Sequence, residues 1–195
     1  MTAPTRPATP SVVVVSGNPR EGSRTLAAAE AAGRRIAELL GAPGPDIGTI
    51  ELAAFAGELL TATHPEADEA KERLARATVA VVATPVYKAS YTGLLKAFLD
   101  LYGPDGLAGV VVVPLVVSGN PAHALAGEVH LRPVLVELGA VVPTRTLALT
   151  EAQLPELGAA LDPWFARWAT PLRRAAGAAT TATPTETPEL TGAVL

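Results

Sequence analysis

The chain has 195 residues, of which 49% are apolar, and its formal net charge is −4. That length suits one domain and is short for two of ordinary size. The mild negative charge, without a long run of Lys and Arg, argues against nucleic acid or an anionic membrane as the main partner. Cysteine is absent, which excludes disulfides and thiol chemistry, and the three histidines are scattered, which argues against a metal site.

The two ends of the chain differ in composition from its middle. Residues 1–10 are rich in Pro, Thr and Ala and have no apolar core of the signal-peptide kind, so we predict a disordered leader. Residues 175–195 are rich in Ala, Thr and Pro, and we predict a flexible tail there. The domain is then expected over 11–174. The apolar run 110–117 is far shorter than the roughly 20 residues that a bilayer requires, so the cytoplasm is the simplest expected location.

Between the ends, short apolar runs alternate with amphipathic segments. We predict strands over 11–16, 47–52, 78–84, 110–117 and 141–149. Helices are predicted over 23–40, 66–76, 91–101, 122–138 and 153–174, the last of them broken or restarted near Pro163.

Three of these strands are apolar throughout, as strands covered on both faces must be. This pattern predicts an α/β fold, a flavodoxin-like three-layer sandwich around a five-stranded parallel sheet of order 2-1-3-4-5. A nucleotide-binding variant with another strand order remains an alternative.

The loop at 16–25, SGNPREGSRT, joins the first predicted strand to the first predicted helix. Backbone N–H groups and the positive end of a helix dipole favour an anion at such a place. The loop lacks the Lys of a nucleoside triphosphate loop, because Ser23 follows Gly22, and it lacks the G-x-G-x-x-G pattern of dinucleotide loops. A single phosphomonoester fits better, although an ordinary connection with a Ser N-cap remains possible.

Two further polar loops, 85–93 and 118–123, follow the third and fourth predicted strands. Because ligands of such sheets bind beyond the carboxyl ends of the strands, we expect all three loops to meet at one crevice. Tyr87 and Tyr91 in the second loop suit the edge and face of a flat heteroaromatic ring.

The three loops and the segments that follow them resemble those of a known family. The segments GNPREGSRT, ATPVYKASYTGLLKAFLDL and SGNPAHALAGEVHLRPVLVELGA are similar to those of the NADPH-dependent FMN reductases, above all to the branch that supplies reduced flavin to sulfonate-degrading monooxygenases. The resemblance covers about 12–149, and Lys88 favours this branch. It implies a flavodoxin-like fold, bound FMN and hydride delivery from NADPH, or from NADH, to flavin N5.

The resemblance also implies a set of cofactor-binding residues. Contacts to the phosphate are expected from Asn18, Arg20, Ser23, Arg24 and Thr25. Contacts to the isoalloxazine ring are expected from Pro85, Val86, Tyr87, Lys88, Ser118 and Gly119. Asn18 departs from the Ser that the family usually has. Outside the resemblance, Arg20 could be a solvated arginine, Tyr87 a packing residue and Lys88 a side chain lying along the rim.

Three functions remain open. The first is an NAD(P)H-dependent FMN reductase that supplies reduced flavin to a partner monooxygenase. For this reaction we predict no catalytic acid or base, because hydride transfer between two cofactors needs none. The second is an FMN-containing NAD(P)H quinone or azo reductase. The third, a flavodoxin-like electron carrier, is the least favoured because the net charge is modest and aromatic residues make up 4% of the chain. The apolar helix 91–101 and the resemblance together predict a homodimer or homotetramer.

Overall fold

The computed structural model describes residues 10–42 and 47–181, and side chains as far as residue 177. The predicted leader, apart from Pro10, and the end of the predicted tail lie outside the described residues. The strands are β1 (Val12–Ser16), β2 (Gly48–Glu51), β3 (Val79–Pro85), β4 (Val111–Ser118) and β5 (Leu147–Thr150). The helices are α1 (Arg24–Leu40), α2 (Pro65–Ala75), α3 (Gly93–Leu99), α4 (Arg132–Glu137) and α5 (Leu157–Thr181). Four short helical segments join them: η1 (Leu52–Phe55), η2 (Pro121–His123), the π-helical η3 (Gly127–Leu131) and η4 (Glu151–Glu156).

The strands form one parallel sheet of order β2-β1-β3-β4-β5, so the predicted topology is confirmed. Valines face one another across its centre, where Val14 pairs with Val81 and Val81 with Val113. Every residue of β1, β3 and β4 is buried. This explains why their sequences are mostly apolar, since a parallel sheet is covered by helices on both faces.

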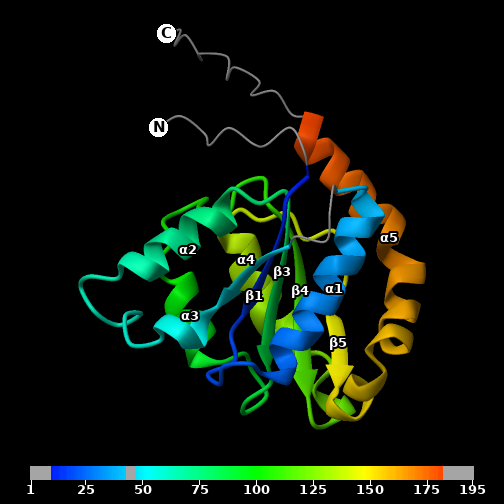
Figure 1. Cartoon of the computed structure of the whole chain (residues 1–195), viewed down its shortest axis with the longest axis horizontal. Coiled ribbons are helices and arrows are strands. Elements are labelled where there is room, and N and C mark those ends of the chain that lie inside the picture. The colour runs from blue at the N-terminus through cyan, green and yellow to red at the C-terminus, as the bar shows by residue number, and fades with distance from the viewer. Residues whose placement is uncertain (1–9, 43–46, 182–195) are drawn as a thin grey trace, which may run out of the picture.

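Two layers of helix cover the sheet, α1 and α5 on one face and α2, α3 and α4 on the other (Figure 1). Side chains of β1 alternate between the layers. Val13 and Val15 pack toward α2 and α3, whereas Val12 and Val14 pack toward α1 and α5. Because all five strands are parallel, their carboxyl ends lie at one edge of the sheet, and α1 begins at that edge.

The last helix differs from its prediction. It runs through Pro163 without a break and continues to Thr181, beyond the predicted end at Arg174. The reason is packing: Leu172 and Ala176 are buried against the α1 side of the sheet, and this burial outweighs the loss of a backbone donor at each of the two prolines in the helix, Pro163 and Pro171. The first part of the predicted tail is thus helical. Within the described residues, no helix is both long and apolar enough to cross a bilayer.

Two further elements are shorter or more divided than predicted. The predicted helix 122–138 is instead η2, the π-helical η3 and the short α4. The predicted strand 141–149 is reduced to β5, and Val141 makes a single isolated bridge to Val111. The guanidinium of Arg132 donates to the carbonyls of Thr144 and Val142, at 2.6 and 2.8 Å, so a side chain from α4 holds this segment in place of a strand ladder.

Candidate functional site

The loops that follow β1 and β3 are tied together at the carboxyl edge of the sheet. Gly17 donates its N–H to the carbonyl of Ala83 at 2.8 Å, and its own carbonyl accepts from the hydroxyl of Thr92 at 2.6 Å. That hydroxyl also caps α3 by accepting from the N–H of Leu95, while the N–H of Thr92 donates to Thr84 Oγ1. A Cβ on residue 17 would lie 2.7 Å from Leu95 Cβ, so only glycine fits there. The crevice loops thus share one buried hydrogen-bond network, which holds their relative positions.

Asn18 organises the polar loop between β1 and α1. Its amide Nδ2 donates to the buried hydroxyl of Thr25 at 3.1 Å, and its Oδ1 accepts from the N–H of Arg20 at 3.0 Å. Ser23 is the N-cap of α1, its hydroxyl accepting from the N–H of Leu26 at 3.1 Å. These hydrogen bonds hold the loop and the N-terminus of α1 at the carboxyl edge of the sheet.

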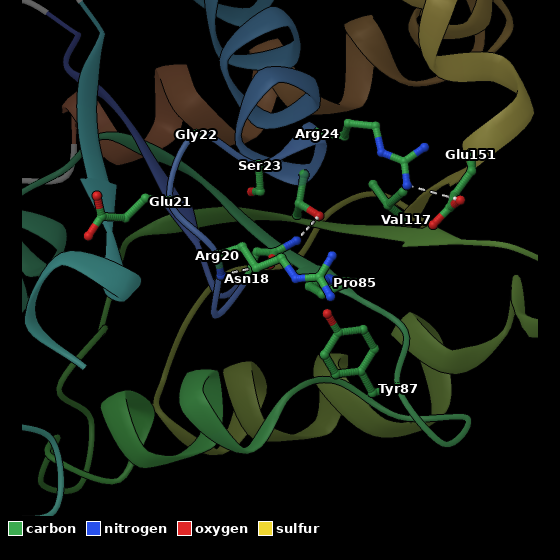
Figure 2. Close-up of a pocket in the computed structure, with 11 residues that line it drawn as sticks. Asn18, Arg20, Glu21, Gly22, Ser23, Arg24, Pro85, Tyr87, Val117 and Glu151 are labelled. Carbon is green, nitrogen blue, oxygen red and sulfur yellow. Dashed lines mark hydrogen bonds and ion pairs between the residues drawn. The ribbon is translucent and has the colours of Figure 1, made fainter. Parts of the chain in front are cut away.

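A pocket of about 320 Å³ lies at this loop (Figure 2). Its polar end is formed by residues of the loop and the first turn of α1, and its other wall is formed by Pro85, Tyr87 and Val117. In Figure 2 the guanidinium of Arg20 and the hydroxyl of Tyr87 point toward one another. The pocket therefore has one end whose guanidinium and helix N–H groups suit an anion and a wall that suits an aromatic ring. Across the described ranges, no group of three or more His, Cys, Asp or Glu side chains could hold a metal ion.

Most of the residues predicted from the sequence meet at this pocket, and the remainder do not line it. Those that line it are Asn18, Arg20, Ser23, Arg24, Thr25, Pro85 and Tyr87. Those that do not are Val86, Lys88, Ser118 and Gly119. Val86 donates its N–H to the carbonyl of Val117 at 2.8 Å, and the hydroxyl of Ser118 donates to the carbonyl of Asn120 at 2.9 Å. Lys88 and Gly119 are exposed.

Lys88 lies in a tight turn that presents Tyr87 to the pocket. Tyr87 and Ser90 exchange two backbone hydrogen bonds, at 2.9 and 3.0 Å, and the φ angles of Lys88 and Ala89 are +50° and +63°. Positive φ at both central residues is the mark of a type I′ turn, which normally has Asn and Gly at those places. The turn is therefore strained, as backbone at functional sites often is.

Two carboxylates that the sequence analysis did not single out contact the polar loop. Glu151 Oε2 lies 3.1 Å from Arg24 Nη2, and Glu51 Oε1 accepts from the N–H of Gly22 at 2.8 Å. Each follows or ends a strand, β5 for Glu151 and β2 for Glu51. The rule that polar groups at the carboxyl ends of strands share one edge could have identified both.

This fold defines a flavodoxin-like protein, and its pocket lies where the strand order reverses. The family model for NADPH-dependent FMN reductases matches residues 10–153. The FMN reductase (NADPH) of Escherichia coli K12 is 39% identical over 132 residues, which cover 66% of this chain and 67% of that protein. The NADH-dependent FMN reductase SfnE of Pseudomonas putida is 36% identical over 148 residues, covering 75% and 80% of the two chains.

The apo structure of an NADH:FMN oxidoreductase, EMOB, superposes with a TM-score of 0.70 at 31% identity, covering 87% of this chain and 90% of that one. The chain therefore belongs to the NADPH-dependent FMN reductase family, an oxidoreductase family, and the resemblance noted from its sequence is confirmed.

Proposed function

We propose that this protein uses NAD(P)H to reduce FMN, that both bind and leave as substrates, and that the reduced flavin passes to a partner monooxygenase. The observation that carries the proposal is the pocket in which guanidinium groups and a helix N-terminus face one end and Tyr87 and Pro85 the other. FMN has the matching two ends, a phosphomonoester and a flat ring system. The family and the relatives' names, all of them FMN reductases, support the same reaction.

The donor set suits FMN. The phosphate would be held by Arg20, by Arg24 and by the N-terminus of α1 behind Ser23, since charged donors and free helix N–H groups favour a dianion. Pro85, Tyr87 and Val117 would lie along the ring. When bound, the flavin ring supplies the redox chemistry by accepting a hydride at N5 from the reduced nicotinamide. The work of the chain is then to bind, to align the two rings and to exclude water.

The overall reaction takes one hydride from NAD(P)H and one proton from solvent, and yields NAD(P)⁺ and reduced FMN. Both coenzymes are proposed, because one relative is named for NADPH and another for NADH. A reductase that releases reduced flavin requires an acceptor that consumes it, and a flavin-dependent monooxygenase is the class we propose.

The test is anaerobic mixing of the purified protein with excess FMN and either NADPH or NADH, while the visible absorbance of the flavin is followed. We expect catalytic loss of that absorbance, many turnovers per protein chain, with at least one coenzyme. If FMN stays oxidised but a quinone or azo dye is reduced by protein that retains its own flavin, the second function replaces the first. If no flavin is reduced at all, the proposal is wrong.

A further inference from the structure

Two carboxylates contact groups of residues that line the pocket, the N–H of Gly22 and the guanidinium of Arg24. Glu51 Oε1 accepts from the N–H of Gly22 at 2.8 Å, and Glu151 Oε2 pairs with Arg24 Nη2 at 3.1 Å. They approach the loop from different elements, Glu51 from the end of β2 and Glu151 from the start of η4. Two groups of the loop, the N–H of Gly22 and the guanidinium of Arg24, thus already have carboxylate partners from the chain itself.

Charge at the pocket is balanced rather than strongly positive. Its lining contains Arg20 and Arg24 but also Glu21 and Glu151. Figure 2 shows the carboxylate of Glu21 pointing away from both arginines, whereas that of Glu151 faces Arg24. Glu151 is therefore the lining carboxylate whose charge acts directly on Arg24, one of the two arginines proposed to hold the phosphate.

We propose that Glu151, with Glu51 as a second contributor, lowers the affinity of the loop for the FMN phosphate so that flavin exchanges freely; this rests on the proposed function. A phosphomonoester carries about −1.5 to −2 charges at pH 7. On its arrival Glu151 must either surrender Arg24 or remain beside the dianion as a like charge. Both routes reduce the net gain from binding.

The Arg24–Glu151 pair has little structural importance, which makes the test clean. The two side chains are 66% and 50% exposed, and exposed pairs contribute little to folding. Glu151→Gln should therefore fold normally while removing one negative charge from the pocket. Glu156→Gln, an exposed position on the same segment η4 outside the pocket, removes the same charge and is the matched control.

The experiment measures the Kd of FMN and of riboflavin, which lacks the phosphate, for the wild type, Glu151→Gln, Glu51→Gln and Glu156→Gln. We expect Glu151→Gln to lower the Kd of FMN by about 3- to 10-fold. Glu51→Gln should lower it by about 2- to 3-fold, because the amide oxygen still accepts from Gly22 but carries no charge. Riboflavin binding should be unchanged in all variants, and Glu156→Gln should match the wild type.

The outcomes separate this inference from the proposed function. Unchanged or weaker FMN binding by Glu151→Gln, in a protein whose wild type binds FMN, overturns the inference and leaves the reductase function standing. Equal tightening of riboflavin, or equal tightening of FMN by Glu156→Gln, also overturns it, because the phosphate at this site would not be the cause. A wild type that binds neither flavin overturns the proposed function itself.

Discussion

Arg20 has the clearest single role in the proposed site. Its backbone N–H is fixed by Asn18 Oδ1 at 3.0 Å, and its guanidinium lies at the pocket with no ion pair among residues 10–42 and 47–177. Arg24, by contrast, forms an ion pair with Glu151. We therefore expect Arg20 to provide the larger share of phosphate affinity.

Replacing Arg20 with Gln should weaken FMN binding by about 1.5 to 3 kcal/mol, because a charge-assisted contact to the phosphate is lost. Riboflavin binding should change little. Fluorescence titration of both flavins measures the two values, and Arg34→Gln, an exposed change further along α1, is the control. Equal losses for FMN and riboflavin would show that Arg20 does not contact the phosphate.

The turn at Lys88 and Ala89 has a different residue-scale consequence. Ala89 has a φ of +63°, a conformation that glycine adopts without steric cost. Ala89→Gly should therefore raise the free energy of unfolding by about 1 kcal/mol. For a chain of this size the melting temperature should rise by about 2 to 4 °C.

The matched change is Ala166→Gly, at an exposed position inside α5, which should lower stability by about 1 kcal/mol because glycine disfavours helix. Calorimetry of both variants provides the comparison. A melting temperature that falls in Ala89→Gly would contradict the assigned turn.

Among the elements, α4 and the segment before β5 depend on one another. Arg132 of α4 donates to the carbonyls of Thr144 and Val142, and Glu128 of η3 accepts from the N–H of Thr146. The side chains of Val142 and Thr144 are buried, so their backbone groups have restricted access to water. These hydrogen bonds from Arg132 and Glu128, which we call the side-chain bracket, hold the segment 142–146 in place of the missing part of the predicted strand.

Arg132→Lys should lower the free energy of unfolding by about 2 kcal/mol, because an ammonium cannot reproduce the two-pronged contact. The expected fall in melting temperature is about 4 to 8 °C. Arg173→Lys, at an exposed position of α5, should change stability by less than about 0.5 kcal/mol. Urea unfolding of the two variants measures the difference, and similar values would show that the bracket is unimportant.

The sequence predicts elements well where burial alone determines them. The strands predicted at 78–84 and 110–117 were found within one residue because every position in them is buried. The π-helical η3 was not predicted, and neither was the close approach of its Gly127 to Thr146, where an added Cβ would lie 2.3 Å from Thr146 Cγ2. The continuous α5 was missed because local rules for proline ignore the burial of Phe165 and Leu172.

The site shows the same division. Arg20 and Tyr87 could be placed from sequence because they follow the carboxyl ends of strands that meet at one edge. The same rule places Glu151 at this edge, but it could not predict that Glu151 pairs with Arg24, since the two residues are far apart in the chain and no periodic pattern links them. The turn that exposes Lys88 also lay beyond prediction, because its residues are unusual for a type I′ turn.

At the scale of the whole molecule, the parallel sheet brings together loops that are distant in sequence. The loops after β1 and β3 share hydrogen bonds through Gly17 and Thr92, and Glu151 reaches them from beyond β5. The helices on the two faces bury the strands (Figure 1), and the pocket lies at the carboxyl edge of the sheet (Figure 2). The pocket at this edge, with arginines at one end and Tyr87 and Pro85 along its wall, is the basis of the proposed reductase.

Steady-state NADPH oxidation by the purified protein at increasing free FMN, together with its flavin content as isolated, tests that account most directly. We predict protein that is nearly free of flavin and a rate that saturates with added FMN, because the proposed function makes flavin an exchangeable substrate. Stoichiometric bound FMN with a rate that added FMN does not raise would contradict the account, since flavin would then be a prosthetic group.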